Sequence, residues 1–212
     1  MSVGPSTRTF KGETADQRVQ QRRAQLIAAG VDVFGTYGYR SATVEHICAR
    51  AGLSKRYFYE SFADSEALLL ACYARCANEI FEAMTVAVMN CPDDIDEQLR
   101  AALTGYFEAI DADQRRARIT LLEILGVGPA VDAAYTEQTA RFATSVQALA
   151  NKAFDGSRLP NTQLHLIAQG IIGAITTIAA QWLLEQRRRP CAQLIESAYV
   201  LVKAVLDRLP QT

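Results

Sequence analysis

The segment AGLSKRYFYESF, residues 51–62, places two cations among several aromatic rings in a short stretch of chain. Lys55 and Arg56 can neutralise phosphate oxygens, and the planar fork of Arg56 matches the O6 and N7 atoms of guanine together. The rings of Tyr57 and Tyr59 can lie against sugars and thymine methyl groups while their hydroxyls donate to phosphates. These residue types predict contact with a nucleic-acid duplex. The alternative is that the two rings pack in a core and the two cations are solvated.

The distribution of charge restricts this chemistry to the front of the chain. The whole chain of 212 residues has a net charge of −1. Residues 1–62 contain nine Lys/Arg and five Asp/Glu, a net of +4, whereas residues 63–212 contain thirteen and eighteen, a net of −5. This basic N-terminal part and acidic C-terminal part indicate that only the N-terminal part binds a polyanion.

Caps and glycines divide the front into three helices. A helical pattern begins at Arg18 and stops at Gly38. Thr43 is a good N-cap for a second, short helix that ends at Gly52. Ser54 is the N-cap of a third helix that runs to about Ser61.

To bind a duplex, these helices must leave the side chains of Lys55, Arg56, Tyr57 and Tyr59 on the surface. Val44, Ile47, Leu53 and Phe58 can pack inward and fix the angle between the two short helices. Such a pair on a longer helix is the helix-turn-helix arrangement, whose second helix enters the major groove of DNA.

Five further residues of the N-terminal part are candidates for contacts with the duplex. His46 lies on the polar side of the second helix, where it could meet a phosphate. Arg22 and Arg23, with Lys11 and Arg18 near them, could add backbone or minor-groove contacts; simple solvation is the alternative for these cations.

The rest of the chain is also predicted to be helical, so we expect an all-α fold. The breaks NCPDD, GVGPA, DGSRLPN and RRRP separate the predicted helices, which span residues 65–89, 94–110, 114–125, 131–154, 163–188 and 191–209. We therefore expect a flexible arm over residues 1–17, a helix-turn-helix domain over 18–64, and a helical effector-binding and dimerisation domain over 65–212.

Several other function classes find no support in the sequence. The motifs GxGxxG, GxxxxGK[ST], HExxH and GxSxG are absent, and neither His46 nor His165 has a recognisable catalytic partner, so no enzyme is predicted. Cys72 and Cys76 could hold half of a metal site, but nothing nearby completes it, and small core residues are favoured. No metal or cofactor is expected.

The compartment is predicted from the cysteines and from the apolar stretches. An odd number of cysteines, five, and no export signal indicate a cytoplasmic protein. The apolar stretch over residues 166–184 is about long enough for a bilayer, but Gln169, Thr176, Thr177 and Gln181 interrupt it. A helix buried in a bundle or a subunit interface is favoured over a membrane span.

Residues 43–69, TVEHICARAGLSKRYFYESFADSEALL, resemble the DNA-binding segment of the tetracycline-repressor (TetR) family. That family has a helix ending in Phe and a Gly-aromatic pair, then Thr-Val-x-x-Ile-Ala, Ala-Gly-Val-Ser-Lys, Tyr-x-x-Phe and Ser-Lys-Glu-x-Leu. The corresponding pieces here are VFGTYGY, TVEHIC, AGLSK, YESF and DSEAL. The motif match covers about residues 20–70, and the remainder resembles the family only in length and helix rhythm.

The resemblance implies roles for individual residues of the DNA-binding segment. Thr43 and Ser54 cap their helices and touch phosphates, Tyr59 holds a phosphate, and Ser61 stands where the family often has a phosphate-contacting histidine. Lys55, Arg56 and Tyr57 face bases or the nearby backbone, and Phe58 and Phe62 are core residues. The sequence departs from the family at Ala63, often lysine, and at Arg56, often a small residue.

The resemblance also implies a dimer and an effector pocket. The last two long helices, within residues 163–209, would form a four-helix interface between two copies, with Leu194, Ala198, Leu201, Val205 and Leu209 on a repeating face; closing the monomer core is the alternative. A small, mostly apolar effector would bind among the middle helices, and the candidate lining residues are Tyr73, Tyr106, Phe107, Glu123, Tyr135, Phe142 and Trp182.

Binding of the effector would favour a conformer with the wrong spacing between recognition helices, with residues 66–89 as the lever, and would release a palindromic operator. A DNA-binding activator or architectural protein without an effector is the alternative.

Overall fold

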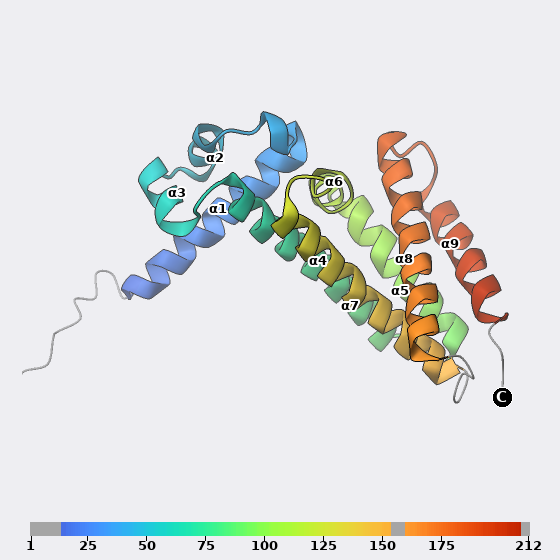
Figure 1. Cartoon of the computed structure of the whole chain (residues 1–212). Helices are drawn as coiled ribbons and strands as arrows, with labels where there is room; N and C mark the ends of the chain where they lie inside the picture. The colour runs from blue at the N-terminus through green and yellow to red at the C-terminus, as the bar shows by residue number, and fades with distance from the viewer. Residues whose placement is uncertain (1–13, 154–159, 209–212) are drawn as a thin grey trace, which may run out of the picture. The chain divides into compact units, whose positions relative to one another are not determined.

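The computed structural model describes residues 14–153 and 160–208, and all the regular structure in these two ranges is helical (Figure 1). This confirms the predicted all-α fold. The chain divides into two compact units, one that ends at Cys72 and one that begins at Tyr73. The boundary lies later than the expected one at residues 64–65, because the first turns of the fourth helix belong to the first unit.

The first unit contains α1 (Ala15–Tyr37), the short helix η1 (Tyr39–Ser41), α2 (Val44–Ala51), α3 (Lys55–Ser61) and the start of α4 (Ser65–Met89). Helix α1 begins earlier than the expected Arg18. Thr14 forms a capping box with Gln17, in which each side chain accepts from the other residue's main-chain N–H. The expected mobile arm otherwise falls on residues 1–13, outside the described ranges.

A close approach between helices fixes the core of the first unit. Gly30 on α1 packs so tightly against α4 that a Cβ placed there would lie 2.6 Å from the Cys72 sulfur and 3.2 Å from Leu68. Phe34 on α1, Ile47 on α2 and Phe58 on α3 are fully buried. The helices α1, α2 and α3 therefore share one hydrophobic core.

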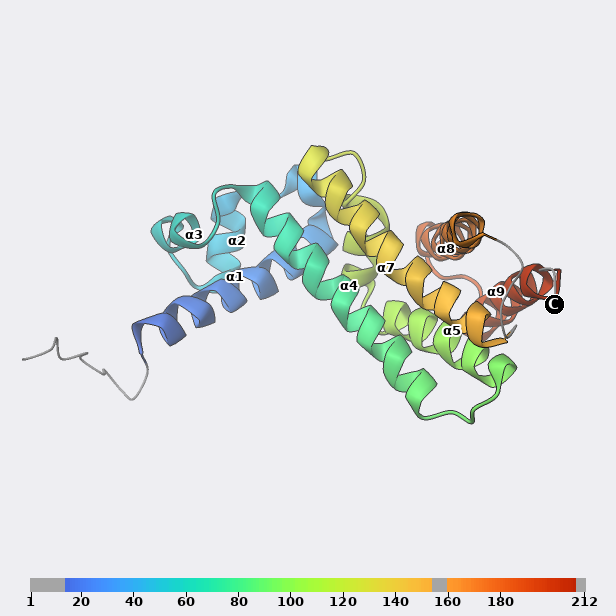
Figure 2. The same cartoon turned by 60° about the horizontal axis from the view of Figure 1, so that its bottom comes forward.

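The second unit contains the rest of α4 together with α5 (Ile95–Ala112), α6 (Gln114–Arg118), a π-helical turn η2 (Ile119–Glu123), α7 (Pro129–Ala153), α8 (Asn161–Leu184) and α9 (Cys191–Leu206). Helix α8 packs on α7, and α9 packs on α5, as the two views of Figures 1 and 2 show. Gly105 on α5 brings that helix against the main chain of α4, because a Cβ there would lie 2.8 Å from the carbonyl oxygen of Ala83.

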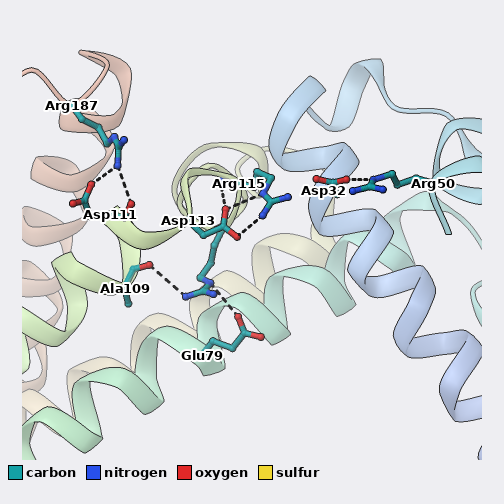
Figure 3. A network of polar contacts seen from close by, with 9 residues as sticks. Asp32, Arg50, Glu79, Ala109, Asp111, Asp113, Arg115 and Arg187 are labelled. Atoms are coloured by element: carbon teal, nitrogen blue, oxygen red, sulfur yellow. Dashed lines mark hydrogen bonds and ion pairs between the residues drawn. The ribbon is translucent and has the colours of Figure 1, made fainter.

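Polar contacts hold the ends of helices α5 and α6 in the second unit (Figure 3). Arg187 bonds to the main-chain and side-chain oxygens of Asp111, and Arg116 pairs with Glu79 at 3.1 Å. Asp113 caps α6 by accepting from the main-chain N–H of Arg115 at 3.0 Å. These contacts fix the turn that leads into the π-helical segment.

Helix α8 is, among the described helices, the one long and apolar enough to cross a bilayer, a test that a core helix of a soluble protein also passes. It packs against α6, α7 and α9, with Ile171, Ile175 and Trp182 buried. Cys72 and Cys76 are both buried, and burial raises the pKa of the Cys76 thiol to about 12. A thiol that stays protonated is a poor metal ligand, and the described residues contain no group suited to a metal ion.

Candidate nucleic-acid interface and effector cavity

Caps and a left-handed glycine set the geometry of the α2–α3 pair. The hydroxyl oxygen of Thr43 accepts from the main-chain N–H of His46 at 3.2 Å. Gly52 has φ +67°, a left-handed conformation that favours glycine, and the N–H of Leu53 bonds to the carbonyl of Cys48 at 3.0 Å. The chain therefore turns sharply between the two helices and starts α3 at Lys55.

The second short helix exposes the side chains that the sequence assigned to a duplex. Phe58 is buried, whereas Tyr59 is 59% exposed and Tyr57 is 37% exposed. The side chain of Arg56 is 84% exposed and pairs with Glu60 on the same helix at 2.9 Å. The alternative in which both tyrosines form core is therefore wrong for Tyr59, and Tyr57 lies at the edge of the surface.

An ion pair joins the first turns of α2 and α3. The ammonium of Lys55 donates to the carboxylate of Glu45, and both side chains are exposed. This hydrogen bond holds the pKa of the Glu45 carboxyl below its ordinary value, so the pair is charged at neutral pH. A carboxylate thus sits beside a cation that the sequence assigned to DNA.

The two arginines of α1 have different environments. The guanidinium of Arg22 lies over the ring of Tyr57, 4.5 Å from its centroid. Arg23 donates to the main-chain carbonyl of Ser61 at 2.7 Å and lies 4.2 Å from the centroid of the Phe62 ring. Arg22 is thus placed beside the predicted DNA surface, whereas Arg23 holds the end of α3 against α1.

The remaining predicted residues lie around the same surface. Thr43, His46 and Ser54 are exposed, the hydroxyl of Ser54 makes no capping bond, and Ser61 is partly buried. Tyr37, at the end of α1, is exposed and lies against His46 with ring centroids 4.8 Å apart.

The second unit contains two adjoining cavities. An inner cavity of about 70 Å³ lies among α4, α5, α7 and α8, and an outer one of about 400 Å³ follows α4 and α5 towards Met89 and Leu206. Both are lined by Phe142 and Leu103, among other shared residues. None of the described residues that line either cavity carries a formal charge.

The predicted pocket residues divide into two groups. Tyr73, Tyr106, Tyr135 and Phe142 line the inner cavity. Phe107 is buried in the helical core, Glu123 pairs with Arg118 at 2.7 Å, and the indole N–H of Trp182 donates to the carbonyl of Arg189 at 2.9 Å; these three line neither cavity. The lining residues that the sequence did not single out include Met84, Gln138, Ile172 and Ile175.

The neutral state of the phenols suits an uncharged occupant. Burial raises the pKa of both Tyr73 and Tyr106, with a smaller contribution from the neighbouring Tyr135. These hydroxyls therefore keep their protons at neutral pH. The cavities combine apolar walls with a few polar groups, which is typical of sites for small molecules.

The chain is similar in sequence to known bacterial transcription regulators. Residues 26–72 match the family model for bacterial regulatory proteins of the tetR family. The chain is 27% identical over 196 residues to the HTH-type transcriptional activator FasR of Mycolicibacterium smegmatis, covering 91% of this chain and 86% of that protein. It is 33% identical over 100 residues to the HTH-type transcriptional regulator BetI of Stenotrophomonas maltophilia, covering 47% and 51%. Both relatives are regulators, in agreement with the prediction of a non-enzymatic protein.

Solved structures share the fold. The fatty acid degradation regulator FadR from Bacillus halodurans has a TM-score of 0.75 at 20% identity, covering 90% of this chain and 97% of that one. The transcriptional regulator FadR from Bacillus subtilis, solved in complex with stearoyl-CoA, has a TM-score of 0.73 at 18% identity, covering 84% and 96%.

Proposed function

Because this chain belongs to the tetR family of bacterial regulatory proteins, we propose that it is a dimeric, cytoplasmic regulator that binds a palindromic operator and is released by a small, mostly apolar effector. It acts as a repressor in this proposal. The DNA-binding residues are Thr43, His46, Ser54, Lys55, Arg56, Tyr57, Tyr59, Ser61 and Arg22.

The exposed side chains of α3 are the observation that supports the proposal of DNA binding. Its core residue Phe58 is fully buried, and the cations and phenols around it point outward from a helix that is locked to α1 and α2. A rigid helix that presents Lys55, Arg56 and Tyr59 suits the major groove, where an arginine can read guanine and the neighbouring groups can bind phosphates.

Exposed residues on α8 and α9 support the proposal of a dimer. One side of α9, with Leu194, Ala198 and Val202, is buried in the monomer, so these residues serve the alternative role of closing the core. The other side exposes Val200 and Leu201, and Leu209 lies outside the described residues.

On α8, after its first turn, the exposed positions recur at helical spacing and are Leu166, Gly170, Gly173, Thr177, Gln181 and Leu184. A Cβ at Gly170 or Gly173 would meet nothing within 4 Å. A second copy could therefore approach this stripe closely.

The two cavities, which have no charged lining residue, support the proposal of a mostly apolar effector. Their combined size suits a long hydrocarbon chain, and one fold relative is described in complex with stearoyl-CoA. We infer a long-chain acyl compound as the effector class. Its binding would shift the population towards a conformer with lower DNA affinity, with α4 as the lever.

Selection of bound sequences from a random DNA pool, with the purified full chain, tests this proposal. A palindrome with half-sites about one helical turn apart is expected. Adding a long-chain acyl compound should then weaken binding to the selected site. A selection that yields no common sequence would contradict the DNA-binding part.

A second candidate follows from the relative FasR, which is named as an activator. In that case the protein would raise transcription from a bound operator. Transcription in vitro from a promoter that carries the selected site distinguishes the two, because a repressor lowers the amount of transcript and an activator raises it.

A further inference from the structure

A buried amide in the inner cavity lacks a hydrogen-bond partner. The side-chain nitrogen of Gln138 on α7 exposes less than 1 Å² and bonds to nothing, and among the described residues it is the one buried side-chain N or O atom in this condition. Buried donors of this kind are rare in folded proteins, because each lost hydrogen bond is costly. The orphaned donor therefore calls for an acceptor from outside the chain.

The threonine donors of the cavity do not compete for the same acceptor, whereas the phenol hydroxyls of Tyr73, Tyr106 and Tyr135, which also line the inner cavity, can donate to it. Thr120 donates to the carbonyl of Arg116 at 3.0 Å, Thr139 donates to that of Tyr135 at 2.9 Å, and Thr176 donates to that of Ile172 at 2.9 Å. These hydroxyl protons are thus used within their own helices. Gln138 is one of the residues that line the inner cavity, and donation to a bound oxygen would require a rotation about its last side-chain bond that turns the N–H towards that space.

The surroundings specify the charge of the acceptor. The described residues that line the two cavities include no lysine, arginine or histidine that could balance a carboxylate. An unpaired anion would lose its hydration there without compensation. A neutral carbonyl or hydroxyl oxygen satisfies the amide without that cost.

We propose that the second unit binds a neutral oxygen-containing amphiphile in one direction, with its oxygen accepting a hydrogen bond from Gln138 in the inner cavity and its hydrocarbon chain in the outer cavity. This inference rests on the proposed function, in which that unit takes an effector. It adds a selectivity rule: ketones, esters or alcohols bind better than alkanes or carboxylates of the same length.

Displacement of a fluorescent apolar dye from the full-length protein tests the rule. The probes are a medium-chain methyl ketone, the alkane and the carboxylate of equal length. We expect the ketone to bind about tenfold more tightly than the alkane, the ratio that one neutral hydrogen bond supplies. Gln138→Leu should lower this preference several-fold while alkane binding persists, because the amide donor is lost and the phenol hydroxyls remain.

Gln147→Leu is the matched control, because Gln147 lies on the same helix but lines neither the inner nor the outer cavity, only a separate space of about 10 Å³ beside the outer one. It should keep the ketone preference. Equal binding of ketone and alkane to the wild type would overturn the inference, and so would an unchanged preference in Gln138→Leu, which would mean that the phenol hydroxyls of the cavity bind the oxygen instead of the amide. Failure of all three probes to displace the dye would overturn the apolar effector itself.

A second measurement covers the case in which Gln138→Leu does not fold. In the wild-type protein, the side-chain amide proton of Gln138 should shift in NMR spectra when the ketone is added and stay in place with the alkane. Identical spectra with both probes would also overturn the inference.

Discussion

Arg23 on α1 holds the end of the recognition helix, since its guanidinium donates to the main-chain carbonyl of Ser61 at 2.7 Å and covers the ring of Phe62. The two bonded residues are 38 positions apart in the chain. The sequence predicted backbone or minor-groove contacts with DNA for Arg23, with simple solvation as the alternative. The observed contacts make it a structural residue that positions α3.

Replacement of this arginine should therefore affect stability first. We expect Arg23→Ala to lower the free energy of unfolding by about 1–3 kcal/mol, because a charged donor and a cation–π contact are lost together. Urea denaturation followed by circular dichroism measures the change, and Gln21→Ala, an exposed neighbour on α1, is the control. Normal stability combined with weaker DNA binding would restore the direct backbone role.

The Glu45–Lys55 pair leads to a prediction about affinity. In the proposed complex, Glu45 would compete with DNA phosphates for the Lys55 ammonium, with which it pairs, and would repel the duplex itself. Glu45→Gln should therefore tighten DNA binding about two- to fivefold at low salt, with a smaller gain at high salt. Fluorescence anisotropy with a labelled operator measures this affinity.

Glu137→Gln on α7 provides the matched change of charge far along the chain from the recognition helix. It should leave the affinity almost unchanged. Weaker binding by Glu45→Gln would mean that the carboxylate positions Lys55 for its contact instead of opposing it.

Arg56 is expected to read a base. Its exposed guanidinium needs only to leave Glu60, an exposed partner on the same helix, to reach the groove. Arg56→Ala should cost about 1–3 kcal/mol of binding free energy at one base pair and relax the preference there. Affinities for a set of single-base operator variants would measure this loss of discrimination.

Tyr59→Phe is the companion variant, because a phosphate contact carries no sequence information. It should weaken binding to every operator variant alike. A loss confined to one base position would assign Tyr59, rather than Arg56, to base reading.

The helix-turn-helix could be predicted from the sequence because its determinants are local. The Thr43 cap and the left-handed Gly52 act within a few residues of their own positions. Arg23 could not be assigned in the same way, because its partner is set by how α3 packs against α1. The sequence alone does not show whether the guanidinium of an arginine donates to a carbonyl oxygen or to solvent.

The cavity was only partly predictable for a related reason. Tyr106 and Phe107 are adjacent aromatic residues, yet Tyr106 faces the inner cavity and Phe107 faces the packed core. Successive helical residues point about 100° apart, and the sequence does not say which direction meets a cavity. Gln138 was missed because a glutamine on an amphipathic helix is usually a solvated residue.

The exposed small residues of α8 lead to the last prediction. Gly173 faces solvent in the described chain, and a side chain there would meet nothing within 4 Å. Gly173→Leu should therefore fold as a monomer but block the close approach of a second copy. We expect the dimer dissociation constant to rise about tenfold or more. DNA affinity should fall with it, because one recognition helix contacts only a half-site.

Sedimentation velocity over a concentration series measures the dissociation constant of the dimer. Thr144→Leu, on the exposed face of α7, adds a similar bulky side chain at a position outside α8 and α9 and should remain dimeric. If Gly173→Leu kept the wild-type dissociation constant, the two copies would have to meet through another surface, and the exposed stripe of α8 would need another explanation.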